Sequence, residues 1–143
     1  IGKVAIPDII QQKPGPLNAS EWQVMKTHTT VGAAILDGSN SPYLQMAVDI
    51  AKYHHERWDG NGYPDGLKGE EIPLTARIMN ICDQYDAIRS ERPYKKAFNH
   101  EESCSIILEG RDRTSPDHID QEVLEVFRKS RSRFAEIYDE LKN

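Results

Sequence analysis

The 143-residue chain has only two cysteines, no long apolar run and no excess of basic residues. Two thiols without close spacing do not indicate a disulfide scaffold or a zinc knuckle, and they favour a reducing compartment. No segment approaches the roughly 20 apolar residues that a bilayer span needs. The net charge of -5 argues against binding to nucleic-acid polymers, which usually needs a basic face. We therefore expect a cytoplasmic protein with no membrane span.

An alternating strand pattern of useful length is also absent. Apolar residues instead recur at helical spacing in five segments, at about residues 20–36, 42–55, 73–90, 99–110 and 121–141. Asn18 with Glu21, or Ser20 with Gln23, can form a capping box at the first of these helices. The sequence thus predicts an all-α bundle of about five to six helices.

Three of the predicted helices carry imidazole or carboxylate groups on their inward faces: His28, the pair His54 and His55, and Asp83. Burying such groups without partners costs several kcal/mol. A metal centre would satisfy them, since neutral imidazole and carboxylate suit Fe, Mn and Zn ions. Each residue also has an ordinary explanation, because a lone buried histidine is more often a hydrogen-bonded core residue. Asp83 could equally pair with a neighbouring arginine.

The two adjacent histidines open the segment "HHERWDGNGYPDGL" at residues 54–67. Adjacent residues of a helix diverge by about 100°, so one such pair rarely chelates one ion. They could contact two neighbouring ions, or one ion and a group behind it. The loop that follows contains Gly60, Gly62 and Gly66, and its composition alone indicates only turns and a packed corner.

A second candidate region is the segment "ERPYKKAF" at residues 91–98. Arg92, Lys95 and Lys96 form a local positive cluster in an acidic protein. The ordinary interpretation is a helix end followed by a solvated basic turn. Next to a metal site, the same cluster would suit a phosphate group.

Together these segments resemble a known family. "HHERWDGNGYPDGL" and then "IPLTARIMNICDQYDAIRSERPYKKAF" resemble the hallmark segments of the HD-GYP domain, a branch of the HD phosphohydrolases. "IGKVAIPDII" with "KPGPL", and "EWQVMKTHTTVGAAIL", are similar to the segments that precede them in that family. The resemblance covers roughly Ile1 to Leu108 in order, and the last helix more weakly. Several long motifs in the family's order make it highly specific.

The resemblance implies a bacterial phosphodiesterase that hydrolyses cyclic di-GMP to pGpG and, in many members, to GMP. It implies a centre of two or three divalent metal ions, often iron or manganese, in an HD-type helical bundle. The metal-ligand positions of the family match His28, His54, His55 and Asp83. The resemblance further assigns residues that activate the site, hold the nucleotide or support the ligands: Lys3 for activation, Tyr63 for guanine or phosphate, Arg92 and Lys95 for phosphates, and Asp86 behind Asp83.

In the family, a His-Asp pair would directly precede Ile1. We therefore expect residues 1–143 to be a partial HD-GYP domain without its N-terminal part. The family further implies an upstream receiver or sensor domain and contacts with GGDEF diguanylate cyclase domains. Two other functions stay open: a catalytically incomplete module that binds nucleotide or protein, and an HD phosphohydrolase of another cyclic dinucleotide.

Overall fold

The computed structural model describes residues 1–91, 96–111 and 113–142. The chain divides into two compact units, Ile1–Met79 and Asn80–Asn143. Regular structure in the described residues is helical, apart from one isolated bridge between Arg111 and Thr114, which confirms the predicted all-α class. No helix in these ranges is both long and apolar enough to cross a membrane.

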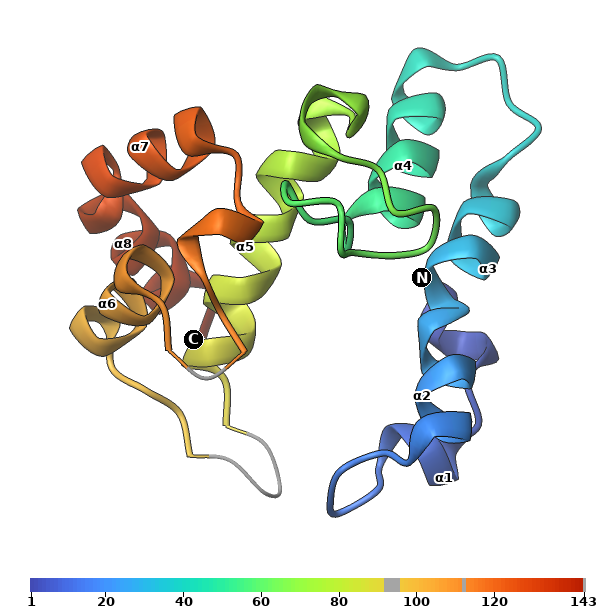
Figure 1. Cartoon of the computed structure of the whole chain (residues 1–143), viewed down its shortest axis with the longest axis horizontal. Helices are drawn as coiled ribbons and strands as arrows, with labels where there is room; N and C mark the ends of the chain where they lie inside the picture. Colours follow the sequence, from blue (N-terminus) through green and yellow to red (C-terminus); the bar gives the residue numbers. More distant parts are fainter. Residues whose placement is uncertain (92–95, 112, 143) are drawn as a thin grey trace. The chain divides into compact units, whose positions relative to one another are not determined.

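The first unit is built around one pair of helices. Its elements are η1 (Gly2–Ala5), α1 (Asp8–Gln11), α2 (Ala19–Lys26), α3 (His28–Leu36), α4 (Pro42–Tyr53) and η2 (Gly69–Glu71), followed by the start of α5 (Leu74–Arg89) (Figure 1). α3 lies beside α4 and also contacts η1. Gly2 is buried at that contact, and a Cβ there would lie 2.7 Å from the Gly32 nitrogen. Close backbone approach therefore fixes η1 against the first turns of α3.

The single helix predicted over 20–36 is wrong in one respect, because the structure divides it into α2 and α3 at Thr27. The sequence "THTT" explains the division. The hydroxyls of Thr27, Thr29 and Thr30 each donate to the carbonyl three residues earlier, at 2.7, 2.9 and 3.1 Å. Threonine hydroxyls that bond back to the helix backbone in this way bend helices. The predicted capping box of Asn18 and Glu21 is present at the start of α2.

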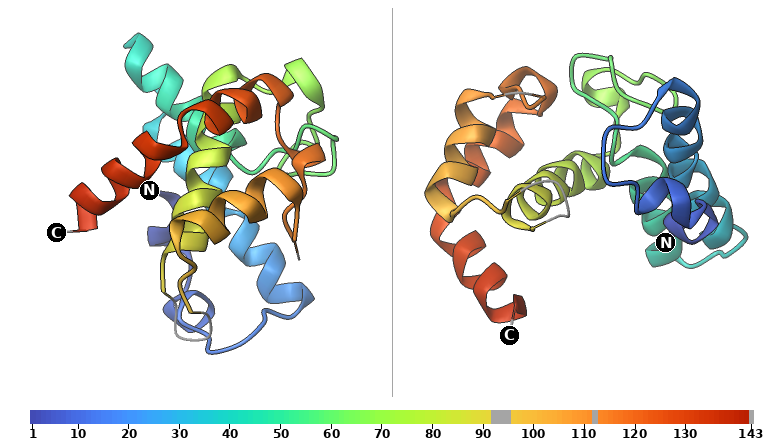
Figure 2. Two further views of the ribbon diagram at one scale, coloured as in Figure 1. Left: turned by 90° about the vertical axis from the view of Figure 1, so that its left-hand side faces the viewer. Right: turned by 90° about the horizontal axis from the view of Figure 1, so that it is seen from below.

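The second unit packs around Tyr85. It contains the rest of α5, then α6 (His100–Glu109), η3 (Pro116–His118), α7 (Gln121–Lys129) and α8 (Arg131–Lys142), visible from two further directions in Figure 2. The Tyr85 ring makes edge-to-face contacts with Phe127 and Phe134, at centroid distances of 6.0 and 5.3 Å. Its hydroxyl hydrogen-bonds to His100 Nδ1 at 2.8 Å. Tyr85 thus packs its ring in an aromatic core and has a hydrogen-bond partner for its hydroxyl. This packing explains why apolar residues recur at helical spacing over residues 73–90.

The predicted last helix, 121–141, is likewise two helices, which meet at Ser130. Ser130 has φ -104° and ψ 12°, outside the helical range. Phe127 before the turn and Phe134 after it pack edge to face at 4.9 Å. Tyr138, one turn further along α8, donates its hydroxyl hydrogen to the Arg89 carbonyl at 2.9 Å. Both aromatic contacts anchor α8 to the core of this unit.

Candidate metal centre

His28 occupies the first position of α3 and is only 6% exposed. Its Nδ1 donates to the Met25 carbonyl oxygen at 2.6 Å. A neutral imidazole that donates from Nδ1 carries its free electron pair on Nε2. The division of the predicted helix at Thr27 therefore places a buried nitrogen acceptor where α2 ends and α3 begins.

His54 and His55 follow directly on the end of α4 at Tyr53. His54 Nδ1 lies 3.0 Å from the Ile50 carbonyl oxygen and 3.1 Å from that of Ala51, which orients its ring. The ring centroids of His54 and His55 lie 4.1 Å apart, and those of His28 and His55 lie 5.0 Å apart. Burial, and then the charges of His54, His28 and Lys3, lower the pKa of His55 to about 3. His55 is therefore a neutral ring at physiological pH.

The three histidines fit a divalent metal ion. Their donor atoms all lie within 4.8 Å of one another. The Nε2 atoms of His28 and His54 face each other at 3.4 Å. Two nitrogens bonded to one ion at about 2.1 Å would lie roughly 3.0–3.4 Å apart. In metal-bound histidines, the ring nitrogen that does not bind the metal usually donates a hydrogen bond to a backbone carbonyl or a carboxylate, as Nδ1 of His28 and of His54 can do here. Facing electron pairs at this distance repel unless a proton or a cation lies between them.

Tyr63 of the glycine-rich loop lies directly beside this cluster. Its ring stacks on His55, with centroids 5.0 Å apart and an interplanar angle of 27°. The edge of Trp22 contacts the same ring at 5.9 Å, and Lys26 Nζ lies 5.8 Å from its centroid. The Tyr63–Pro64 peptide bond is cis. The loop thus brings an aromatic ring with a phenol hydroxyl to the edge of the three imidazoles.

The other predicted site residues have different positions. Lys3 is exposed on η1, and its charge contributes to the lowered pKa of His55. Asp83 and Asp86 are exposed on α5 within the second unit, and their assignment as ligand and supporting group stays a prediction. Arg92 and Lys95 lie outside the described residues. The structure therefore brings His28, His54, His55 and Tyr63 together in one unit.

Glu56 and Gly62 also shape the site, although their residue types and positions in the sequence indicated no role for them. Glu56 is 2% exposed, and its carboxylate accepts hydrogen bonds from three backbone N–H groups of the loop. Gly62 lies so close to the backbone of residues 55–57 that a side chain would collide with it. The sequence shows that Glu56 directly follows the candidate ligands His54 and His55. Which way its carboxylate points depends on the path of the loop that follows.

Comparisons with known proteins agree on the family. Residues 1–123 match the HD domain family. A cyclic di-GMP phosphodiesterase of Thermotoga maritima is 46% identical over 138 residues, which are 96% of this chain and 36% of that protein. The cyclic di-GMP phosphodiesterase response regulator RpfG of Xanthomonas campestris is 47% identical over 113 residues, 79% of this chain and 30% of the regulator. A 3'3'-cGAMP-specific phosphodiesterase of Vibrio cholerae is 47% identical over 102 residues, 71% of this chain and 20% of that enzyme.

The chain spans about a third of the length of the curated relatives it matches first. The match to the HD domain nevertheless covers residues 1–123 of 143, and the predicted resemblance to the cyclic dinucleotide phosphodiesterases is confirmed by these relatives. The chain therefore belongs to the HD domain family, in its HD-GYP branch.

Proposed function

We propose that the protein is a metal-dependent phosphodiesterase that hydrolyses cyclic di-GMP to pGpG, to GMP, or to both. The observation that carries the proposal is the group of three histidines whose donor atoms converge within 4.8 Å. Relatives that are named cyclic di-GMP phosphodiesterases and are 43–46% identical over 96% of this chain support the substrate.

The metal centre would be held by His28, His54, His55 and Asp83, with two or three iron or manganese ions. Divalent ions in such a centre supply Lewis-acid chemistry for hydrolysis of a phosphodiester. The imidazoles of the first unit are arranged to bind a cation, because backbone carbonyls orient His28 and His54 and the pKa of His55 is far below neutrality. Asp86 would support Asp83 from one helical turn further along α5.

The chain's own residues would orient the nucleotide around these ions. Tyr63 would contact guanine or phosphate from its place on His55. Arg92 and Lys95 would bind the phosphates and offset charge that builds up during hydrolysis. Lys3, whose positive charge contributes to the lowered pKa of His55, would stabilise negative charge near the histidine cluster.

A mixed cyclic dinucleotide is the second candidate substrate. The Vibrio cholerae relative named a 3'3'-cGAMP-specific phosphodiesterase is 47% identical over its aligned residues, as high as RpfG. The two substrates differ in one purine base and share the phosphodiester ring. The chemistry of the histidine cluster is therefore the same for both, and the groups that contact the bases would decide between them.

The partners and the location extend the same proposal. RpfG is named a response regulator, which supports an upstream receiver or sensor domain. GGDEF diguanylate cyclase domains, which make the messenger, are the proposed protein partners. Both cysteines are free thiols, which supports a reducing cytoplasm.

The test uses the full-length protein loaded with manganese, or with ferrous iron under anaerobic conditions. Cyclic di-GMP and 3'3'-cGAMP are supplied separately and in competition, and products are separated by chromatography. Metal content per chain is measured on the same samples. Binding is followed by fluorescence of Trp22, which touches Tyr63, in a Trp58→Phe background that leaves Trp22 as the one tryptophan of residues 1–143.

Formation of pGpG or GMP, with cyclic di-GMP preferred in competition, is the expected result. Preferred turnover of 3'3'-cGAMP would instead support the second candidate. Bound metal with no product from either nucleotide would refute both. In that case a change in Trp22 fluorescence on adding nucleotide would indicate a binding module.

A further inference from the structure

Glu56 directly follows the two histidines, yet its carboxylate points into the loop. Oε1 accepts hydrogen bonds from the backbone N–H groups of Asp65 and Gly66, at 2.7 and 3.1 Å. Oε2 accepts one from Leu67 at 3.0 Å. Three consecutive N–H groups thus converge on one buried carboxylate, an arrangement of backbone dipoles that favours an anion.

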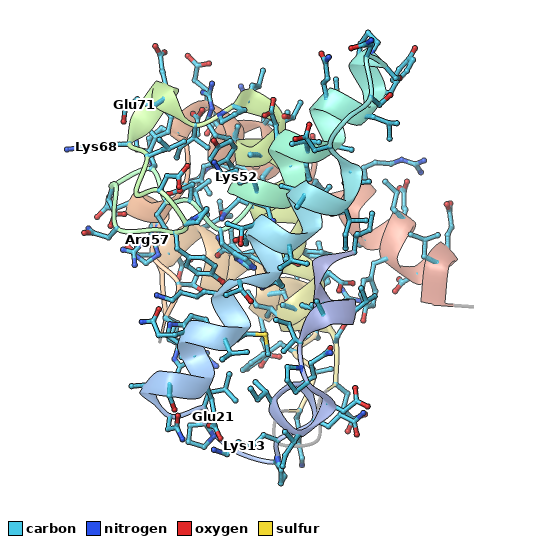
Figure 3. The ribbon with its side chains drawn as sticks, turned by 90° about the vertical axis from the view of Figure 1, so that its right-hand side faces the viewer. Lys13, Glu21, Lys52, Arg57, Lys68 and Glu71 are labelled. Atoms are coloured by element: carbon cyan, nitrogen blue, oxygen red, sulfur yellow. The ribbon has the colours of Figure 1, made fainter. Side chains whose placement is uncertain are left out.

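This contact holds the C-terminal half of the loop. A carboxylate that is 2% exposed would be strongly disfavoured without hydrogen bonds, and bonds to a charged acceptor are stronger than neutral ones. Lys52 of α4 adds an ion pair to Asp65 at 2.9 Å, on the more exposed side of the same segment. Figure 3 shows Lys52 and Arg57 at the loop. The segment 65–67 is therefore tied to the chain around the histidines at two places.

The N-terminal half of the loop is tied to the same backbone. The Tyr63 N–H donates to the His55 carbonyl oxygen at 3.2 Å. Gly62 passes the Glu56 Cα so closely that an added Cβ would lie 2.6 Å from it. Hydrogen bonds therefore hold the loop on both sides of the Tyr63 side chain, one to the His55 carbonyl and three to the Glu56 carboxylate. The Tyr63 ring stacks on His55.

We propose that Glu56 is a positioning residue that holds the loop so that Tyr63 stays on His55, and that it is not a metal ligand. The inference rests on the proposed function in one respect, because it assigns the purpose of Tyr63 as contact with the cyclic dinucleotide. Both Glu56 oxygens are engaged by the loop. Among the residues that the structure describes, the group that could hold a metal is His28, His54 and His55, without Glu56.

The experiment compares Glu56→Gln with a matched control, Glu71→Gln, in the full-length manganese-loaded protein. Glu71 also accepts a backbone N–H, that of Lys68 at 2.9 Å, but it is exposed on η2. Glutamine keeps the length of the side chain and turns one acceptor into a donor that faces N–H groups. The measurements are metal content, kcat and KM with cyclic di-GMP, and hydrogen exchange of peptides that cover residues 60–67, which leaves out the Lys68 N–H bonded to Glu71.

For Glu56→Gln we expect unchanged metal content, a KM at least about tenfold higher with a smaller change in kcat, and at least about tenfold faster exchange at residues 65–67. Glu71→Gln should stay within about twofold of the wild type in all three. Loss of metal in parallel with activity would overturn the proposal and make Glu56 a ligand. Unchanged KM with unchanged exchange would overturn it as well.

Two safeguards keep the result interpretable. If Glu56→Gln does not fold, Glu56→Asp is measured in the same way, since its shorter side chain cannot reach all three N–H groups. If the wild type turns over no cyclic dinucleotide, the proposed function fails. Hydrogen exchange and metal content still decide the role of Glu56 in that case, because neither needs turnover.

Discussion

Replacing Gly62 by alanine tests whether the loop is as closely fitted as the structure indicates. A Cβ at this position would lie 2.6 Å from both the Glu56 Cα and the His55 carbonyl oxygen, and it would also collide with the Arg57 nitrogen. These are backbone atoms of the segment that carries the candidate ligands, so no side chain can rotate away. No side chain fits at residue 62, so this position requires glycine.

The size of the effect follows from the contact distances. An ordinary contact begins near 3.4 Å, so relief of a 2.6 Å contact needs a displacement of about 0.8 Å. Overpacking of this kind costs about 1–3 kcal/mol. In a chain of this length the melting temperature would fall by roughly 3–10 °C. A shift of about 1 Å in a group that positions the substrate can reduce turnover about 100-fold.

Gly15→Ala is the matched control. A Cβ at Gly15 meets no atom within 4 Å, so the same chemical change has no steric consequence there. Its melting temperature should equal that of the wild type or rise slightly, because alanine restricts the unfolded chain. Thermal unfolding by circular dichroism and turnover of cyclic di-GMP are measured for both variants. A Gly62→Ala protein with wild-type melting and wild-type turnover would refute the close fit of the loop.

Three further predictions concern a candidate metal ligand, the positive cluster at residues 92–96 and the ion pair between Arg57 and Asp59. His54→Ala should remove bound metal and lower turnover at least about 100-fold while helicity stays constant; retained metal with full activity would contradict its role. Arg92→Ala should raise KM without changing metal content, and an unaltered KM would count against phosphate binding. Burial raises the pKa of Asp59, but hydrogen bonds from Arg57 and from the Asn61 N–H outweigh it and lower this pKa from 3.8 to about 2. The Asp59 carboxylate therefore stabilises the fold above about pH 4, and this stabilisation is lost as the pH falls towards 2. The melting temperatures of wild type and Asp59→Asn should differ most near neutral pH and converge in acid; a pH-independent difference would be inconsistent with this linkage.

The helical class and most helix ends were predictable because they depend on local periodicity and capping. The Asn18–Glu21 capping box is present as predicted, and the helix expected over 73–90 is α5, Leu74–Arg89. The divisions at Thr27 and Ser130 were not predicted. Apolar periodicity continues through both, whereas a division depends on hydroxyl bonds to the backbone and on tertiary aromatic packing.

Part of the candidate site was also predictable. His28, His54 and His55 were identified from their shared placement on inward faces, and the structure places them together. The direction of Glu56 could not be predicted, because it depends on a loop that returns nine to eleven residues later. The same return explains why Gly62 is a glycine. Periodicity describes one helix at a time and contains no information about such contacts.

The end of α4 determines how the rings of the adjacent His54 and His55 lie relative to each other. Within a helix, neighbours diverge by about 100°, which favoured separate ions or a supporting role for one ring. The structure ends α4 at Tyr53, and His54 and His55 lie in the turn beyond it. The turn brings their rings to 4.1 Å, while bonds from His54 to the last carbonyls of α4 keep its Nε2 directed at His28. Both rings can therefore contribute to one centre because the second is no longer constrained by helical geometry. A helix that continued through His55 would separate them, so the end of α4 is as much a part of the candidate site as the imidazoles are.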